Sequence, residues 1–216
     1  MMKLTPSQRE AVETEAKDVL VIAGAGSGKT MVLIERIIHL FTRRGASPSE
    51  LLVLTFTRAA AAEMRERLRQ RLADSGQSDA PRLVQSMWMG TFHSMALRML
   101  RGDGGHLGYN PEHLTVCSQD DADALLKQVC KDLGHLKLGP RGKEHWADGL
   151  SWDRLGRARE EAYTSQRQSV SDVRLGLILG EYWARLHQMN CLDFGRILQE
   201  CRRLLGEWPE VLSRYR

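Results

Sequence analysis

The segment AGAGSGKT at residues 23–30 restricts the fold more than any other part of the chain. An apolar run, VLVI at 19–22, precedes it, and a helical pattern over 29–43 follows it. Glycines allow successive backbone N–H groups to curl around a phosphate, and a helix N-terminus adds partial positive charge there. A loop of this composition between a strand and a helix therefore predicts a nucleotide-phosphate site in an α/β protein.

Each side chain of this loop has an expected role. We expect the ammonium of Lys29 to reach the terminal phosphates and the hydroxyl of Thr30 to bind Mg²⁺. The strict pattern begins with glycine where this chain has Ala23, and small size is sufficient at that position. Lys29 is the expected catalytic residue. The expected nucleotide contacts are Ala23, Gly24, Ala25, Gly26, Ser27, Gly28, Lys29 and Thr30. The alternative interpretation is a glycine-rich turn without a ligand.

The order of strand and helix patterns predicts an α/β core. LLVLTFT at 51–57 and the segment 87–92 are short apolar runs, typical of buried parallel strands. Together with 19–22 and the helix over 29–43, they predict a βαβ arrangement. Later segments have helical patterns, because Ser118 and Asp121 form a capping box for a helix to about Leu133 and few strand signals follow. We therefore expect an α/β core that carries a helical insertion.

Composition excludes several classes of protein. The chain has 216 residues, 42% of them hydrophobic, and its net charge of +4 permits a polyanionic partner without requiring one. The four cysteines, Cys117, Cys130, Cys191 and Cys201, form no CxxC pair, so we expect reduced thiols. No apolar run approaches the roughly 20 residues that span a bilayer, so we expect no membrane partner and a cytoplasmic location.

The opening segment LTPSQREAV at residues 4–12 supports two interpretations of Gln8. Thr5 is a suitable N-cap, Pro6 suits the first helical position, and Gln8 stands where a capping box places its amide. The functional alternative is that this amide, which has a donor and an acceptor, contacts the edge of adenine. The phosphate loop that follows favours the second interpretation.

The motifs taken together resemble the first half of a UvrD/Rep-type superfamily 1 DNA helicase. Five segments carry the resemblance in the same order: LTPSQREAV, AGAGSGKT, LTFTRAAAAEMRERL at 54–68, GTFHSMALRML at 90–100 and LDFGRILQECRRLL at 192–205. The resemblance implies a RecA-like P-loop core at 1–105, an inserted helical subdomain at 106–190, and helices returning to the core at 191–216. It also implies ATP and Mg²⁺ as cofactors.

The resemblance further implies the activity and the partners. The whole protein would be an ATP-dependent 3′-to-5′ DNA helicase in DNA repair, replication or recombination. It would act on single-stranded DNA and on junctions of single and double strands. Arginine and alanine at 58–60 are closer to the AddA or RecB-like pattern than to TFTNKAA, so the subfamily is open.

By the same resemblance, two strand ends would contact DNA. The implied residues are Thr55, Phe56, Thr57, Arg58, Thr91, Phe92 and His93. An exposed phenylalanine can stack on a base, and threonine hydroxyls can bond phosphates. The alternatives are that Phe56 and Phe92 belong to the core and that His93 is structural.

Two basic clusters also have a functional and a purely structural interpretation. At helical spacing, Arg58, Arg65 and Arg69 form a stripe beside the apolar residues Ala61, Met64, Leu68 and Leu72. This stripe could bind phosphates, or it could be a solvated face paired with Glu63 and Glu66. The second cluster combines Trp146 and Trp152 with Arg154, Arg157 and Arg159, for which core tryptophans with solvated arginines are the alternative.

No acidic pair in the sequence suits the hydrolysis of a P-loop nucleotide. That reaction needs a carboxylate for Mg²⁺ after an apolar strand, whereas Asp120–Asp121 and Glu160–Glu161 follow polar or helical sequence. In the relatives an acidic motif follows a segment like WPEVLSRYR at 208–216. We therefore expect the remainder of the motor as a partner and no turnover by this chain alone. The alternatives are a non-hydrolysing nucleotide- and DNA-binding module and, more remotely, a small-metabolite kinase.

Overall fold

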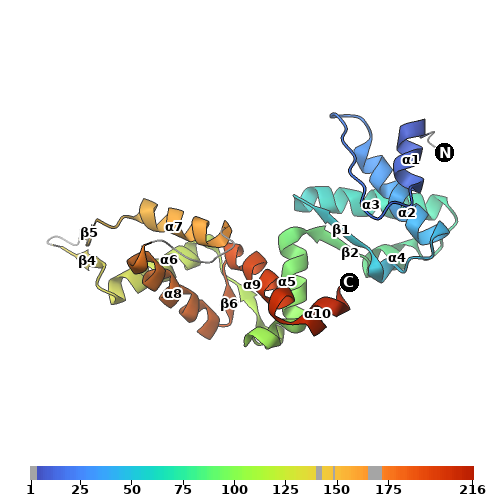
Figure 1. The fold of residues 1–216 in the computed structure, drawn as a ribbon. Helices are drawn as coiled ribbons and strands as arrows, with labels where there is room; N and C mark the ends of the chain where they lie inside the picture. Colours follow the sequence, from blue (N-terminus) through green and yellow to red (C-terminus); the bar gives the residue numbers. More distant parts are fainter. Residues whose placement is uncertain (1–3, 140–142, 148, 165–171) are drawn as a thin grey trace. The chain divides into compact units, whose positions relative to one another are not determined.

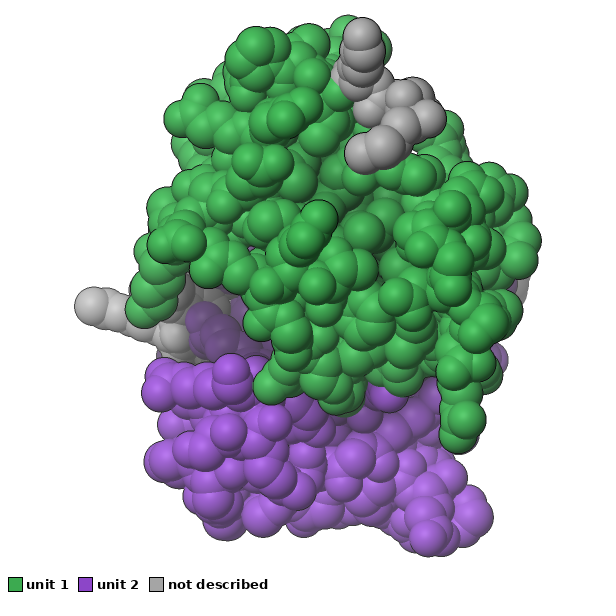
Figure 2. Space-filling model, turned by 90° about the vertical axis from the view of Figure 1, so that its right-hand side faces the viewer, with its two compact units in different colours: residues 1–95 green, residues 96–216 purple. Residues whose placement is uncertain are grey.

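The structure is a computed structural model that describes residues 4–139, 143–147, 149–164 and 172–216. It divides into two compact units, unit 1 (Met1–Met95) and unit 2 (Ala96–Arg216), coloured separately in Figure 2. The boundary lies earlier than the expected end of the core at residue 105. The assignment of 106–190 as an insertion and of 191–216 to the core stays a prediction. No helix among the described residues combines the length and apolar character needed to cross a bilayer.

Unit 1 combines helices with one pair of parallel strands (Figure 1). Its elements are α1 (Pro6–Glu13), α2 (Lys29–Arg43), the short 3-10 helix η1 (Pro48–Glu50), β1 (Leu52–Thr55), α3 (Arg58–Asp74), α4 (Ala80–Ser86), β2 (Trp88–Thr91) and the start of α5 (Phe92–Asp103). Strands β1 and β2 pair in parallel with Thr55 opposite Thr91. The mixed α/β class expected from the sequence is therefore confirmed, with a small sheet.

Local sequence explains where the helices of unit 1 begin. Thr5 caps α1, Pro6 occupies its first turn, and Gln8 completes the capping box. Helix α3 presents its predicted apolar stripe to the core, where Leu68 and Leu72 are fully buried. These leucines pack with residues of α2, β1, α4 and β2, so the strand pair is covered by an amphipathic helix.

The expected strand at 19–22 is wrong for the described structure. Its residues form no strand, and Leu20 and Ile22 are 85% and 87% exposed. A strand needs a neighbour for its backbone groups, and among the described residues β1 pairs only with β2. The apolar sequence of this segment indicates burial, but no described part of the chain supplies the second strand.

Unit 2 is largely helical, and it begins with the greater part of α5, after which its described elements are short strands, two 3-10 helices and longer α-helices. They are η2 (Gly104–Leu107), η3 (Pro111–His113), β3 (Thr115–Val116), α6 (Gln119–Asp132), β4 (Leu136–Leu138), β5 (Glu144–Trp146), α7 (Trp152–Thr164), α8 (Val173–Gln188), β6 (Cys191–Leu192), α9 (Phe194–Glu207) and α10 (Pro209–Arg214). Strands β3 and β6 pair in parallel, and β4 and β5 form an antiparallel hairpin. Part of the helical pattern expected over 150–216 lies outside the described residues.

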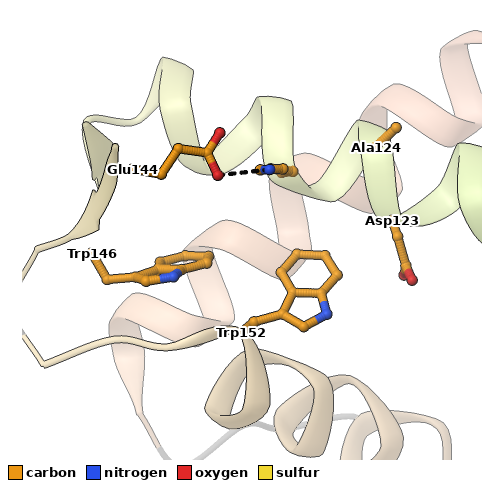
Figure 3. Close-up of a pocket in the computed structure, with 6 residues that line it drawn as sticks. Asp123, Ala124, Glu144, Trp146 and Trp152 are labelled. Carbon is orange, nitrogen blue, oxygen red and sulfur yellow. Dashed lines mark ion pairs between the residues drawn. The ribbon is translucent and has the colours of Figure 1, made fainter. Parts of the chain in front are cut away.

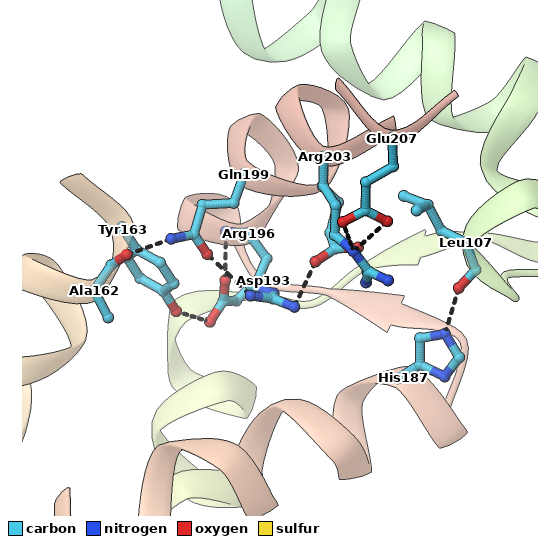
Figure 4. Close-up of polar contacts among 10 residues, drawn as sticks. Leu107, Ala162, Tyr163, His187, Asp193, Arg196, Gln199, Arg203 and Glu207 are labelled. Atoms are coloured by element: carbon cyan, nitrogen blue, oxygen red, sulfur yellow. Dashed lines mark hydrogen bonds and ion pairs between the residues drawn. The ribbon is translucent and has the colours of Figure 1, made fainter. Parts of the chain in front are cut away.

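A buried polar cluster fixes the start of α9 in unit 2 (Figure 4). Asp193 is 5% exposed and caps α9 by accepting the N–H of Arg196 at 2.9 Å. Its second oxygen accepts the hydroxyl of Tyr182 at 2.6 Å and that of Tyr163. Burial and the Asp193 charge raise the pKa of both tyrosines above the usual value. Asp193, the first residue of the Asp-Phe pair in the last sequence motif, therefore has a structural role here.

Candidate functional site

The glycine-rich loop at 23–30 adopts a backbone that requires glycine at two positions. Gly26 has φ of 74° and Gly28 has φ of 85°, a left-handed conformation that costs other residues free energy. Gly28 is also the N-cap of α2. The Ser27 hydroxyl donates to the carbonyl of Gly24 at 2.7 Å. The loop therefore curls back on itself before the helix begins.

The backbone N–H groups of residues 26–30 have no acceptor among the described residues. They belong to the loop and the first turn of α2, where a helix leaves its N–H groups free and carries partial positive charge. Such groups form a binding site for an anion. The loop therefore fits the triphosphate expected from its sequence.

Lys29 and Thr30 complete the binding groups of the loop. The Lys29 ammonium is exposed and donates to the carbonyls of Ala23 at 2.9 Å and Gly24 at 2.6 Å. The half-buried Thr30 has no hydrogen-bond partner for its hydroxyl among the described residues. The loop therefore offers an exposed cation for phosphate and an uncommitted hydroxyl for Mg²⁺, and both roles stay predictions.

Gln8 connects α1 to this loop. Its Oε1 accepts the N–H of Thr5 at 2.9 Å, and its Nε2 donates to the carbonyl of Ser27 at 3.1 Å. A Cβ at position 28 would lie 3.3 Å from the same Nε2. The capping box predicted from the sequence is confirmed. The predicted contact with adenine is untested, and it would use the remaining N–H and lone pair of the amide.

The described acidic residues do not assemble a metal site. No group of three or more His, Cys, Asp or Glu residues suited to a metal occurs within the described ranges. Asp121 caps α6 together with Ser118, and Glu160 and Glu161 lie within α7. Asp193 directly follows β6, but its oxygens accept the bonds described above. The expectation that this sequence lacks the carboxylate for hydrolysis stays a prediction.

The ends of β1 and β2 bring two aromatic rings together. The register places Thr55 opposite Thr91, so the following residues, Phe56 and Phe92, lie at the same edge of the strand pair. Their ring centroids are 6.1 Å apart with the planes tilted by 54°. Phe56 is 93% exposed and Phe92 is 48% exposed. The alternative that these rings belong to the core is therefore wrong.

The neighbouring polar residues mainly shape the strand ends. Thr55 is buried and donates to the carbonyl of Thr57, whose own hydroxyl caps α3 by accepting the N–H of Ala60 at 3.1 Å. Thr91 accepts the N–H of Ser94 at 3.2 Å. Burial lowers the pKa of His93, so its ring favours the neutral form. DNA contacts by these groups stay predictions.

The arginines of α3 differ in their partners. Arg58 is exposed and has no ion-pair partner among the described residues, which suits the predicted phosphate contact. Arg65 donates to the carbonyl of Met89 in β2 at 2.7 Å. Arg69 pairs with Glu66 on the same helix, at 2.6 Å. Arg69 therefore fits the alternative of a solvated helix face whose arginines pair with glutamates. Arg65 fits neither interpretation, because it connects α3 to the strand pair.

Sequence reasoning missed two contacts that hold this surface. Ser94 accepts the N–H of Thr91 at 2.8 Å, and a Cβ at Gly90 would lie 2.5 Å from its hydroxyl oxygen. The spacing of Thr91 and Ser94 is that of a helix cap, so the signal was present. Arg36 of α2 donates to the carbonyls of Val12 and Thr14 and thereby holds the end of α1. Those acceptors are backbone atoms, which no sequence pattern identifies.

A glycine-rich loop that caps a helix, in a mixed α/β unit with a parallel strand pair, defines the P-loop class of proteins. The sequence profile of the UvrD/REP helicase N-terminal domain matches residues 4–216. The chain therefore belongs to the UvrD/REP helicase N-terminal domain family, which implies a RecA-like P-loop fold that is incomplete here.

Curated relatives include "ATP-dependent DNA helicase UvrD1" of Mycobacterium leprae (strain TN), 34% identical over 217 residues and 99% of this chain. Another is "ATP-dependent DNA helicase PcrA" of Staphylococcus aureus (strain Mu50 / ATCC 700699), 33% identical over 216 residues and 98% of this chain. This chain spans 27% of the UvrD1 sequence and 28% of the PcrA sequence. It is therefore related to the N-terminal part of ATP-dependent DNA helicases.

Proposed function

We propose that this chain is the ATP- and single-stranded-DNA-binding N-terminal part of an ATP-dependent DNA helicase. The observation that carries the proposal is the loop at 23–30, whose free N–H groups lead into α2 beside Lys29 and Thr30. We further propose 3′-to-5′ movement and a role in DNA repair, replication or recombination, in the cytoplasm. These finer points rest on the family resemblance.

In this proposal the residues of unit 1 bind and orient the nucleotide. The N–H groups of residues 26–30 would hold phosphate oxygens, and Lys29 would exchange its two carbonyl acceptors for them. Thr30 would hold Mg²⁺, and Gln8 would contact adenine. Hydrolysis of the bound ATP would supply the free energy for movement along DNA. Because Gln8 also contacts the carbonyl of Ser27, adenine binding would be coupled to the loop.

The aromatic pair supports the DNA part of the proposal. Phe56 and Phe92 expose apolar rings next to Arg58, a cation without an ion-pair partner among the described residues. Aromatic rings bind bases of any sequence by stacking, and an arginine adds attraction for phosphate. This combination suits a motor that moves along a strand irrespective of its sequence.

Calorimetric titration with ATP and Mg²⁺ tests the nucleotide part. We expect Lys29→Ala to weaken binding by at least about tenfold, since a charge-assisted hydrogen bond contributes about 1.5–3 kcal/mol. Lys17→Ala removes an exposed lysine of the same unit and should leave binding unchanged. Equal affinities for the Lys29→Ala variant and the wild type would refute the assignment of the loop.

Anisotropy of a labelled single-stranded oligonucleotide tests the DNA part. Phe56→Ala and Phe92→Ala should each weaken binding by about 5- to 150-fold, equivalent to about 1–3 kcal/mol per stacked base. Leu52→Ala, which removes a half-exposed apolar side chain from β1, is the matched control. Unchanged affinity in both phenylalanine variants would contradict the proposal.

A DNA-stimulated ATPase assay separates binding from turnover. We expect no stimulated turnover by these 216 residues, because neither Asp120–Asp121 nor Glu160–Glu161 follows an apolar strand, where the carboxylate that holds Mg²⁺ is needed. Robust turnover that Lys29→Ala abolishes would contradict this expectation. Reading the coding DNA past codon 216 then distinguishes the helicase from a non-hydrolysing module, since a following apolar run with Asp-Glu supports the former.

A further inference from the structure

Unit 2 contains a pocket whose walls include two tryptophans (Figure 3). It has a volume of about 360 Å³ and lies between α6, the end of β5 and the start of α7. This volume is in the range of about 300–1,000 Å³ that small-ligand sites occupy. The pocket is lined by Asp123, Ala124, Lys127, Glu144, Trp146 and Trp152. The nucleotide loop and the aromatic pair described above belong to unit 1, so they do not account for this pocket.

The two indole rings form an apolar wall. Their centroids are 6.3 Å apart, with the planes tilted by 39°. Trp146 packs against the core of unit 2, whereas Trp152 is 39% exposed. The expectation of two core tryptophans therefore holds only for Trp146. Exposing a large aromatic surface to water is unfavourable, so the Trp152 ring is available to a planar ligand.

The charged groups around the pocket are largely neutralised by one another. The Glu144 carboxylate accepts Lys127 at 2.6 Å and Lys131 at 3.0 Å, and these lysines lower its pKa. One oxygen of Asp123 accepts Arg159 at 2.9 Å and Gln119 at 2.8 Å. The other oxygen has no donor among the described residues. The pocket therefore combines an apolar wall with one open hydrogen-bond acceptor and little uncompensated charge.

These features discriminate between ligand classes. A phosphate would meet two carboxylates and three basic groups that are already paired with them. A cation would meet Lys127, Lys131 and Arg159, which already outnumber the two carboxylates. A neutral, planar ring with N–H groups has neither problem, because it can stack on indole and donate to a carboxylate. A nucleobase has this chemistry.

We propose that the pocket binds a base of single-stranded DNA by stacking on Trp152 and donating to Asp123. This inference rests on the proposed function, which makes a DNA strand the available source of bases. It adds a base-stacking site in unit 2 to the one proposed at Phe56 and Phe92 in unit 1. Because the cations around the pocket are already paired with its carboxylates, the pocket offers phosphate no free positive charge, so the base enters it and the backbone of the strand stays outside.

The test compares two single-stranded oligonucleotides of equal length and charge, one with bases and one abasic, on the 216-residue chain. We expect Trp152→Ala to weaken binding of the base-containing strand by about fivefold or more and to leave the abasic strand unaffected. Trp152→Phe retains a ring and should recover most of the affinity. Leu177→Ala, which removes an exposed apolar side chain of α8, is the matched control.

A second variant keeps the test independent of folding. Ala124→Leu fills the pocket from the exposed surface of α6 without removing a polar contact, so it should reproduce the loss. If both variants bind like wild type while Phe56→Ala and Phe92→Ala lose affinity, this inference is wrong and the proposed function stands. If all four bind like wild type, both fail.

Three further outcomes would also overturn the inference. Equal losses on the base-containing and abasic strands would mean that Trp152 acts on the backbone or on folding and not on a base. Competition by a free nucleoside as potent as that of the strand would assign the pocket to a small molecule. Loss of protein–protein association without loss of DNA binding would assign it to a polypeptide partner.

Discussion

Replacing Asp193 by alanine should destabilise unit 2 by an amount that the structure allows us to calculate. The change removes the N-cap of α9, which costs about 1 kcal/mol. It also leaves the hydroxyl of Tyr182, a fully buried residue, without its acceptor, at a cost of about 1–3 kcal/mol. Tyr163 is only half buried, so water can replace its acceptor. The expected loss is about 2–4 kcal/mol in the free energy of unfolding.

Urea unfolding followed by tryptophan fluorescence measures this loss. Four of the five tryptophans, those at 146, 152, 183 and 208, belong to unit 2, so the signal reports mainly on that unit. Trp183 lies against the cluster, because the guanidinium of Arg196 sits 4.9 Å from its ring centroid. Asp193→Asn retains an oxygen for the cap and should cost less than half as much.

A double variant provides the decisive comparison. In Asp193→Ala/Tyr182→Phe the hydroxyl that would be orphaned is absent, so this protein should be more stable than Asp193→Ala alone by about 1 kcal/mol. The reasoning is refuted if the loss of unfolding free energy in the double variant equals the sum of the losses in the two single variants. It is also refuted if Asp193→Ala costs under about 0.5 kcal/mol, since relief of a buried charge would then offset every lost contact.

Three further experiments test other parts of the structure. Gly28→Ala should weaken ATP binding and destabilise unit 1 by about 1–2 kcal/mol in urea unfolding. Gly45→Ala imposes a similar φ strain, but its Cβ would not approach Gln8, so this control should lower stability without changing ATP binding. Leu68→Ala should cost about 2–5 kcal/mol of unfolding free energy, and a loss below about 1 kcal/mol would contradict the described core. Burial raises the pKa of Cys130 and Cys201 from 9.0 to about 11, so in native protein at pH 8 a disulfide reagent should react about 100-fold more slowly with them than in urea. Since these pKa values are raised on folding, their stabilising contribution is complete below pH 9.0 and is lost as pH rises to about 11.

Local signals predicted the helix starts well, because a cap is a contact between neighbours in sequence. Thr5 and Gln8 form both predicted hydrogen bonds at the start of α1. At the start of α6 Ser118 accepts the N–H of Asp121 as predicted, but the Asp121 carboxylate accepts the Ser118 hydroxyl in place of its N–H. The loop at 23–30 was equally predictable, since its glycines and its lysine lie close together in the chain. Such features follow from a few residues and need no knowledge of the remaining fold.

Features that depend on partners distant in the sequence could not be predicted in the same way. The segment 19–22 has the composition of a buried strand, but strand formation needs a neighbour that no pattern within it identifies. Asp193 accepts hydrogen bonds from the hydroxyls of Tyr182 and Tyr163, which lie 11 and 30 residues away in the sequence. The exposure of Trp152 depends on how α6 and α7 pack. Each of these outcomes is decided by tertiary contacts and not by periodicity.

The exposed segment 19–22 also provides a means of detecting a binding event. Among the described residues its backbone N–H groups donate to no acceptor, so their exchange with deuterium should be fast. Any polypeptide that pairs with the segment as a second strand would close these N–H groups into hydrogen bonds and slow their exchange. The four amides that lead into the phosphate loop would thus report, residue by residue, the moment at which the sheet around that loop is completed.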